Sequence, residues 1–143
     1  MSDGGDATDV VTKVGLALVR DGRLLLVRRH GDRALILPGG KPLAGETDVE
    51  ALARELWEEL CCRLVPSSLR YLGEFIDELV DDPRRQVLIR LYAGKVAGTL
   101  SPASEIREAV WHPVADLSET TLAPSLRHQI LPSLARTPTA RPS

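Results

Sequence analysis

Residues 40–62 read GKPLAGETDVEALARELWEELCC, and the interpretation of the whole chain starts from this stretch. Apolar side chains recur there at helical spacing, which predicts a helix from Glu46 to Leu60. Thr47 is the expected N-cap, because Glu50 three residues later can complete a capping box. The apolar arc expected to face the core consists of Val49, Leu52, Ala53, Leu56 and Leu60.

Three carboxylates share another side of this predicted helix. Glu55, Glu58 and Glu59 stand at positions i, i+3 and i+4, which neighbour each other on a helix surface. Taken alone, such a stripe is typical of a solvated helix face. Close carboxylates repel each other, however, and a hard divalent cation removes that repulsion. Mg²⁺ is the first candidate and Mn²⁺ the second.

The loop before the helix adds a second feature. The adjacent glycines Gly39 and Gly40 allow a tight turn and a close approach of backbone to a ligand. Such a loop can direct carbonyls at a metal or amides at a phosphate, and Lys41 places a positive charge beside it. Loop, lysine and glutamates together suit a phosphate chain bridged to the protein by divalent cations.

These residues resemble the Nudix box, whose pattern is Gly, five residues, Glu, seven residues, then Arg-Glu-aliphatic-any-Glu-Glu-any-Gly-aliphatic. The residues that match it are Gly40, Glu46, Arg54, Glu55, Leu56, Glu58 and Glu59. The chain departs from the pattern at Cys61, where the box has glycine, and at Cys62, where it has a bulkier aliphatic residue. Since glycine favours a positive φ after a helix, Cys61 implies either strain or a different helix end.

The resemblance implies an α/β fold, the Nudix-type α/β/α sandwich with a mixed β-sheet. It further implies a hydrolase that breaks a pyrophosphate bond in a nucleoside diphosphate derivative, with water attacking phosphorus. Carried over by position, the catalytic residues are Glu55, Glu58 and Arg54, of which Glu55 is a candidate general base. The metal ligands are Gly39, through its carbonyl, Glu55, Glu58 and Glu59.

Four residues are expected to bind substrate or to brace the binding loop: Gly40, Lys41, Glu46 and Arg28. Glu46 is also expected to pair with Arg54. Arg28 and its neighbour Arg29 end a predicted strand, and an arginine fork matches phosphate oxygens.

The general base of some family members lies outside the box. The substitutes by character are Glu105, Glu108, Glu78 and Asp82.

The remaining segments predict strands around this helix. Residues 10–19 and 24–27 are rich in apolar and β-branched side chains and flank a turn signal at residues 20–22, which together predict a hairpin. Extended segments are expected at 69–80, 87–92 and 106–114, and a closing helix at 125–131 before Pro132. Residues 1–9 and 137–143 are expected to be flexible tails around one Nudix hydrolase domain at 10–136.

The charge balance, the length of the apolar runs and the cysteine content exclude several classes of function. With 20 acidic and 18 basic residues the chain has no electrostatic case for long nucleic acid or an anionic membrane. No apolar run reaches the roughly 20 residues of a membrane span, and the first residues do not resemble a secretory signal. Two neighbouring cysteines form no disulfide framework, which predicts a cytoplasmic protein. Dimers are common in the family, so a homodimer is an open alternative to a monomer.

The expected substrate is a small nucleotide, with a nucleoside triphosphate, oxidised or not, as the leading candidate. ADP-ribose or a nucleotide sugar is the first alternative. A sensor module that binds a nucleotide without cleaving it is the second, and a structural Ca²⁺ site the last. The intact glutamates argue against the sensor, and the chain has no Asp-rich calcium loop.

Overall fold

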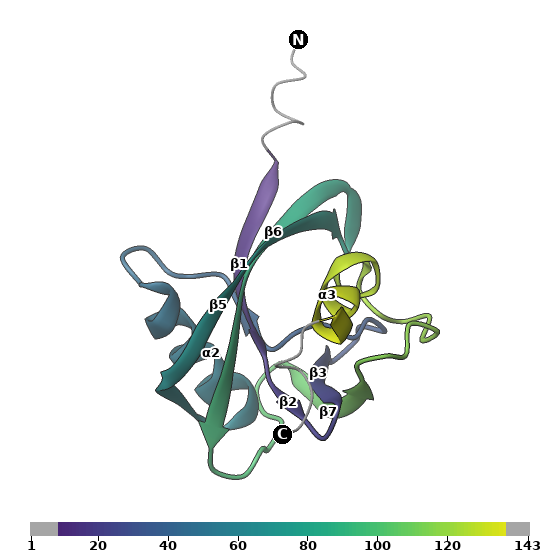
Figure 1. Ribbon diagram of the computed structural model, residues 1–143. Helices are drawn as coiled ribbons and strands as arrows, with labels where there is room; N and C mark the ends of the chain where they lie inside the picture. The colour runs from purple at the N-terminus through teal and green to yellow at the C-terminus, as the bar shows by residue number, and fades with distance from the viewer. Residues whose placement is uncertain (1–8, 137–143) are drawn as a thin grey trace.

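The computed structural model describes residues 9–136 (Figure 1). Its elements are β1 (Val10–Ala17), β2 (Val19–Arg20), β3 (Arg23–Arg29), β4 (Gly39–Gly40), α2 (Asp48–Leu60), β5 (Arg63–Leu79), β6 (Asp82–Ala97), β7 (Ile106–Pro113), the π-helix η1 (Leu126–Ile130) and α3 (Leu131–Arg136). The predicted tails at 1–9 and 137–143 lie outside this range except for Asp9. The division into tails and one domain therefore stays a prediction.

Two sheets form the centre of the molecule. The larger has the strand order β4-β1-β6-β5, in which β1 runs parallel to β6 and the other neighbours are antiparallel. The smaller has the order β2-β3-β7 and is antiparallel throughout. Helix α2 lies on one side of these sheets, and η1 with α3 lies on the other (Figure 1). The expected α/β class with a mixed sheet is thus confirmed.

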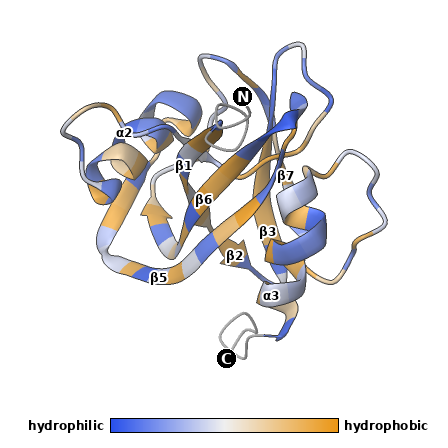
Figure 2. Ribbon diagram, turned by 90° about the horizontal axis from the view of Figure 1, so that it is seen from above, coloured by the Kyte–Doolittle hydropathy of each residue, from blue (hydrophilic) through white to orange (hydrophobic). Residues whose placement is uncertain are grey.

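Strand β3 is apolar from Leu24 to Val27 because both of its faces are covered. In β3, Leu24 and Leu26 belong to the cluster on the η1 and α3 side, whereas Leu25 and Val27 belong to the cluster under α2. All of these side chains are 0% exposed. Figure 2 shows the same arrangement, with apolar strands inside and a largely hydrophilic outer face on α2. The fold therefore has two apolar clusters, one on each side of the strands.

Helix α2 begins where the capping box predicts. The Thr47 hydroxyl accepts a hydrogen bond from the Glu50 N–H, and the Glu50 carboxylate accepts one from the Thr47 N–H. Its buried residues include Ala51 and Glu59, which were not expected in the core, together with Leu52, Leu56 and Leu60. The expectation for Val49 was wrong, because this side chain is 38% exposed in the first turn of the helix.

The N-terminal hairpin is shorter than expected. β1 pairs with β6 and β4 in the larger sheet, and only the two-residue strand β2 pairs with β3 across the turn at Asp21-Gly22. The chain changes sheets at Leu18, whose carbonyl accepts a hydrogen bond from Leu25 N–H. A long-range parallel partner for β1 has no local signal in the sequence, which explains why the local hairpin was overestimated.

The C-terminal helix also differs from the prediction. Helical structure does not stop before Pro132 but continues through it, as η1 followed by α3. Pro132 lies inside a helical run from residue 124 to residue 136 and directly follows the π-helical turn of η1. The N–H of Leu131 donates to the carbonyl of Leu126, a π-type bond across five residues. Among residues 9–136, no helix is long and apolar enough to cross a membrane.

Candidate functional site

The glycine pair of β4 brings the backbone directly against helix α2. Gly39 and Gly40 pair with Gly15 and Val14 of β1, so the loop is held by the sheet. Gly39 has a φ of 134°, and a Cβ there would overlap the Val14 carbonyl oxygen. A Cβ on Gly40 would overlap the carboxylate of Glu55. Both positions therefore require glycine, one for its conformation and one for space.

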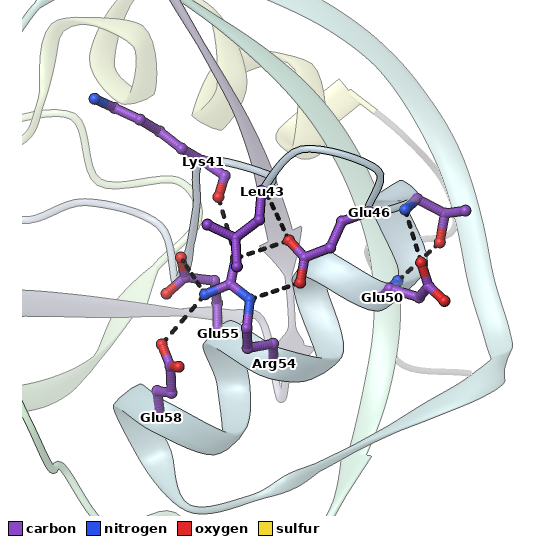
Figure 3. A network of polar contacts seen from close by, with 8 residues as sticks. Lys41, Leu43, Glu46, Glu50, Arg54, Glu55 and Glu58 are labelled. Atoms are coloured by element: carbon purple, nitrogen blue, oxygen red, sulfur yellow. Dashed lines mark hydrogen bonds and ion pairs between the residues drawn. The ribbon is translucent and has the colours of Figure 1, made fainter.

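Arg54 is the centre of the polar network on α2 (Figure 3). Its guanidinium binds Glu46 through two hydrogen bonds of 2.6 and 2.9 Å, which is the pairing expected from the sequence. Nη1 of Arg54 lies 3.3 Å from a carboxylate oxygen of Glu55 and 3.3 Å from one of Glu58. Nη2 donates to the Lys41 carbonyl at 3.2 Å, which connects the helix to the loop. One cation thus contacts three carboxylates and the loop.

Glu46 fixes the loop as well as the arginine. Its carboxylate accepts a hydrogen bond from the Leu43 N–H at 2.7 Å in addition to those from Arg54. The Arg54 hydrogen bonds, followed by the one from Leu43, lower the pKa of Glu46 to about 2. Hydrogen bonding to Glu46 raises the pKa of Arg54 above its ordinary value. Both groups therefore stay charged at neutral pH, and Glu46 acts as a brace whose oxygens are already committed.

Glu59 is the buried member of the acidic stripe. Its side chain is 3% exposed, and Oε1 accepts a hydrogen bond from the Gly39 N–H at 3.2 Å. Burial raises the pKa of Glu59 to about 8, a rise that the Gly39 hydrogen bond opposes and the charge of Glu55 reinforces. Burial also raises the pKa of Glu55. Glu55 and Glu59, both with a raised pKa, are therefore neighbours where α2 meets β4.

The acidic stripe fits a hard cation by its chemistry. Within residues 9–136 no group of three or more His, Cys, Asp or Glu side chains converges on one point, since Glu55 and Glu58 turn toward Arg54. The available donors are nevertheless carboxylate oxygens and a glycine backbone, which Mg²⁺ and Mn²⁺ prefer. Glu59 in particular is a buried acid with one amide donor, and such a group gains most from a cation.

A groove of about 470 Å³ runs along this region. Its wall includes Gly39, Gly40, Lys41, Arg54 and Glu55, which the sequence had singled out. It also includes residues from the β5–β6 hairpin and from elsewhere in the chain, namely Val11, Lys13, Arg29, Leu43, Leu79, Asp81, Asp82, Arg85 and Glu105. The groove is therefore strongly charged, with cations opposite the carboxylates of α2.

A smaller and mainly apolar cavity of about 50 Å³ opens beside the groove. The two share Lys13, Arg29, Gly39, Gly40 and Leu79. The rest of its lining consists of Val14, Gly15, Ile36, Leu37, Glu78, Val80, Val87, Ile89, Ala123, Ser125 and Leu126. The Ser125 residue is 3% exposed, and no hydrogen bond of its hydroxyl occurs among the described residues. A charged groove thus leads into an aliphatic pocket with few polar groups.

Arg29, rather than Arg28, lies in this cavity. The Nε of Arg28 lies 2.9 Å from Glu108, and its Nη1 donates to the Arg33 carbonyl. Arg28 is absent from the lining of both spaces, so its position gives no support to the predicted substrate contact. Arg29 lines both, and its buried Nε has no hydrogen-bond partner among the described residues. Neighbouring residues of a strand point to opposite faces, which separates the two arginines.

Lys13 was missed by the sequence reasoning. It lies on β1 and lines both the groove and the cavity. Burial lowers the pKa of Lys13, and the nearby charges of Arg29 and Lys41 lower it further. Three cations are therefore close enough to interact, although β1, β3 and the β4 loop are distant in sequence. The signal available in the sequence was a lysine within an otherwise apolar strand.

The remaining candidates occupy different places. Glu105 and Asp82 line the groove, Glu78 lines the cavity, and Glu108 is engaged with Arg28. Neither Phe75 nor Tyr92 lines the groove or the cavity. Tyr92 instead donates a 2.6 Å hydrogen bond to Asp48 at the start of α2, and its ring lies 5.1 Å from that of Tyr71.

A family model described as the NUDIX domain matches residues 11–134 of the chain. The chain belongs to the Nudix family. A MutT-like protein of Streptomyces ambofaciens is 41% identical over 54 residues, which cover 38% of this chain and 35% of that protein. This match therefore spans about a third of the relative's length.

Solved structures of relatives cover more of the chain. The solution structure of the E. coli ORF135 protein is 26% identical in sequence and has a TM-score of 0.73. The match covers 96% of each of the two chains. A MutT NUDIX hydrolase from Burkholderia pseudomallei is 27% identical with a TM-score of 0.63, over 77% of this chain and 88% of that one. The Burkholderia relative is described as a Nudix hydrolase. The family uses divalent cations and small nucleotide substrates.

Proposed function

We propose that this Nudix hydrolase is a Mg²⁺-dependent pyrophosphohydrolase of nucleoside triphosphates, oxidised ones included. The observation that carries the proposal is the continuity of the charged groove with the aliphatic cavity. Lys13 and Arg29 line both, so a phosphate chain bound to them would extend toward the carboxylates of α2. A base attached to the same chain would then lie at the mouth of the cavity, against its apolar walls.

The residues proposed to hold the cation are Glu55, Glu58, Glu59 and the Gly39 carbonyl. When bound, Mg²⁺, or Mn²⁺ in its place, supplies neutralisation of phosphate charge and a lower pKa for water. The arginine of the box positions these ligands, since Arg54 holds Glu55 and Glu58 while Glu46 anchors the arginine. Phosphoryl transfer depends mainly on such positioning and on neutralisation of charge.

Glu55 is our candidate for the general base. It borders the groove and adjoins the glycine loop, so its carboxylate faces the space assigned to the phosphates. Burial raises the pKa of Glu55 above its ordinary value, which strengthens the carboxylate as a proton acceptor. The nearby charge of Arg54 opposes this rise. Glu105, which also lines the groove, is the alternative base.

The decisive experiment is a hydrolysis screen with products identified by mass. It includes the four common nucleoside triphosphates, 8-oxo-dGTP, ADP-ribose, a nucleotide sugar and a dinucleoside polyphosphate, each with and without Mg²⁺. We expect pyrophosphate and a nucleoside monophosphate from at least one triphosphate, in Mg²⁺ only. Preferential cleavage of ADP-ribose or the sugar would replace our substrate by the alternative, and tight binding without turnover would favour a sensor.

Two variants test the carboxylates. We expect Glu58→Gln and Glu59→Gln each to reduce turnover at least about a hundredfold while the fold is kept, because each removes a charged ligand. Circular dichroism and the melting temperature check the fold. Near-normal Mg²⁺-dependent hydrolysis in both variants would refute the proposed cation site.

A cytoplasmic location and a homodimer stay predictions, which fractionation and sedimentation would check.

A further inference from the structure

The aliphatic cavity lies between two segments that are far apart in the sequence. Glu78, Leu79 and Val80 at the end of β5 provide one wall, and Ala123 to Leu126 provide the other. Figure 1 shows the β5–β6 hairpin bending away from the sheet toward α3. The width of the cavity therefore depends on how the hairpin is held against the C-terminal helices.

Two helix residues hold the hairpin by polar contacts. The Gln129 side-chain amide donates to the Ile76 carbonyl at 2.5 Å and to Asp77 Oδ2 at 3.1 Å. His128 Nδ1 lies 3.0 Å from the same Asp77 oxygen. The Asp77 side chain is only 13% exposed, so these contacts are partly shielded from water. We define Asp77, His128 and Gln129 as the hairpin latch.

The latch directly adjoins the wall of the cavity. Asp77 immediately precedes Glu78, and Gln129 follows Leu126 by less than one helical turn. The helix that carries Gln129 is the π-helix η1, whose wider turn often marks a functional position. Behind the latch, Leu79 and Val80 pack against the core cluster that contains Leu126 and Ile130. The latch and this apolar contact thus act on the same two walls.

We propose that Asp77 and Gln129 are positioning residues that hold the walls of the cavity in place against the nucleobase and thereby set KM for the nucleotide. This inference rests on the proposed function, because the base is assigned to the cavity there. Neither residue lines the groove where phosphorus would react, so the latch affects binding and leaves the chemical step unchanged. A loss of binding that is equal in the ground state and the transition state raises KM at constant kcat.

The test uses Gln129→Glu, which places a carboxylate against Asp77 and the Ile76 carbonyl, and Gln129→Ala, which only removes the donor. We expect KM to rise about tenfold in Gln129→Glu and less in Gln129→Ala, with kcat within about twofold of the wild type. KM is measured for whichever of ATP, GTP, CTP and UTP is hydrolysed fastest. The double variant Asp77→Asn with Gln129→Glu restores an amide–carboxylate pair and should recover part of the lost affinity.

Arg136→Ala is the matched control, because Arg136 is exposed on α3 and makes no hydrogen bond or ion pair among the described residues. Hydrogen exchange provides a readout without substrate. We expect faster exchange of the amides of residues 76–82 in Gln129→Glu and unchanged exchange in the control. Unchanged KM and unchanged exchange in Gln129→Glu would overturn the latch, as would a fall in kcat alone. Absence of hydrolysis by the wild type would instead refute the proposed function, while the exchange data would still decide the latch.

Discussion

Cys61 ends helix α2 in a conformation that usually belongs to glycine. Its φ of 54° and ψ of 28° are left-handed, and its N–H donates to the Trp57 carbonyl. Of the two alternatives expected from the sequence, strain is therefore the one observed. The cysteine keeps the helix end of the Nudix box at an energetic cost.

Replacement of this cysteine should relieve the strain. We expect Cys61→Gly to raise the free energy of unfolding by about 1 kcal/mol, because glycine has no Cβ penalty at positive φ. Chemical denaturation measures the change. Cys61→Ala keeps a Cβ and serves as the control, for which no comparable gain is expected. An equal gain in both variants would show that the sulfur, rather than the backbone conformation, was responsible.

Glu59 should make stability depend on pH. The pKa of Glu59 is raised to about 8 by burial, from an ordinary value of 4.5. Between these values the folded protein keeps the proton that the unfolded chain releases, so the contribution of Glu59 to stability is full below pH 4.5 and is lost as pH rises through 8. We expect this decline with chelator present, and a smaller one for Glu59→Gln.

Denaturation at a series of pH values in EDTA checks this expectation. Glu58→Gln is the control, since that carboxylate is 51% exposed and should leave the decline unchanged. We further expect Mg²⁺ to stabilise the protein more at pH 8 than at pH 5, because binding requires the ionised acid. An identical decline in wild type and Glu59→Gln would contradict the assignment.

At the level of elements, α2 is anchored to the sheet at its first residue. Asp48 accepts two hydrogen bonds from Arg90 of β6, at 2.9 and 2.7 Å, and one from the Tyr92 hydroxyl at 2.6 Å. The Arg90 hydrogen bond is the main reason that the pKa of Asp48 is lowered. These contacts set where the helix starts and hence where its glutamates lie.

Removal of the tyrosine hydroxyl should weaken this anchor. We expect Tyr92→Phe to lower the free energy of unfolding by about 2 kcal/mol, because a hydrogen bond to a charged carboxylate is lost. Tyr71→Phe is a matched control, since Tyr71 is 53% exposed and its ring adjoins that of Tyr92. A similar loss for both tyrosines in thermal or chemical denaturation would argue against a role for the Asp48 bond.

Helix α2 could be predicted closely because its signals are local. Thr47, Glu50 and the glutamate spacing lie within one segment, and the observed helix starts and ends within two residues of the prediction. The pairing of β1 with β6 joins residues such as Val14 and Arg90, which are far apart in sequence. Strand pairing of this kind depends on the whole fold, so local patterns could not give it.

At the scale of the whole molecule, charge is distributed unevenly. The net charge is −2, yet Lys13, Arg29 and Lys41 meet at the groove. The box identified the acidic side of the site, because its residues have fixed spacing. It could not identify Lys13 and Arg29, because their approach depends on how β1, β3 and β4 are arranged. The aliphatic cavity was missed for the same reason.

The two neighbouring arginines offer a paired test. We expect Arg29→Gln to raise KM for a nucleoside triphosphate about tenfold, because it removes a phosphate-facing cation. Arg28→Gln, which loses the pair with Glu108 outside the groove, should leave KM within about twofold. Steady-state kinetics at two salt concentrations completes the test, since screening weakens the effect of Arg29. Equal changes of KM in the two variants would contradict a specific role for Arg29 in phosphate binding.

The glycine pair of β4 pairs with β1 in the larger sheet and also lines the groove that we propose as the reaction site. Both the fold and the proposed activity therefore require glycine at these two positions, so substitutions there should not be tolerated. Changes of substrate preference should arise instead in the walls around Val80 and Ser125, where variation leaves the carboxylates untouched. A library of variants confined to those walls should therefore change the substrate preference of this enzyme with the fewest substitutions.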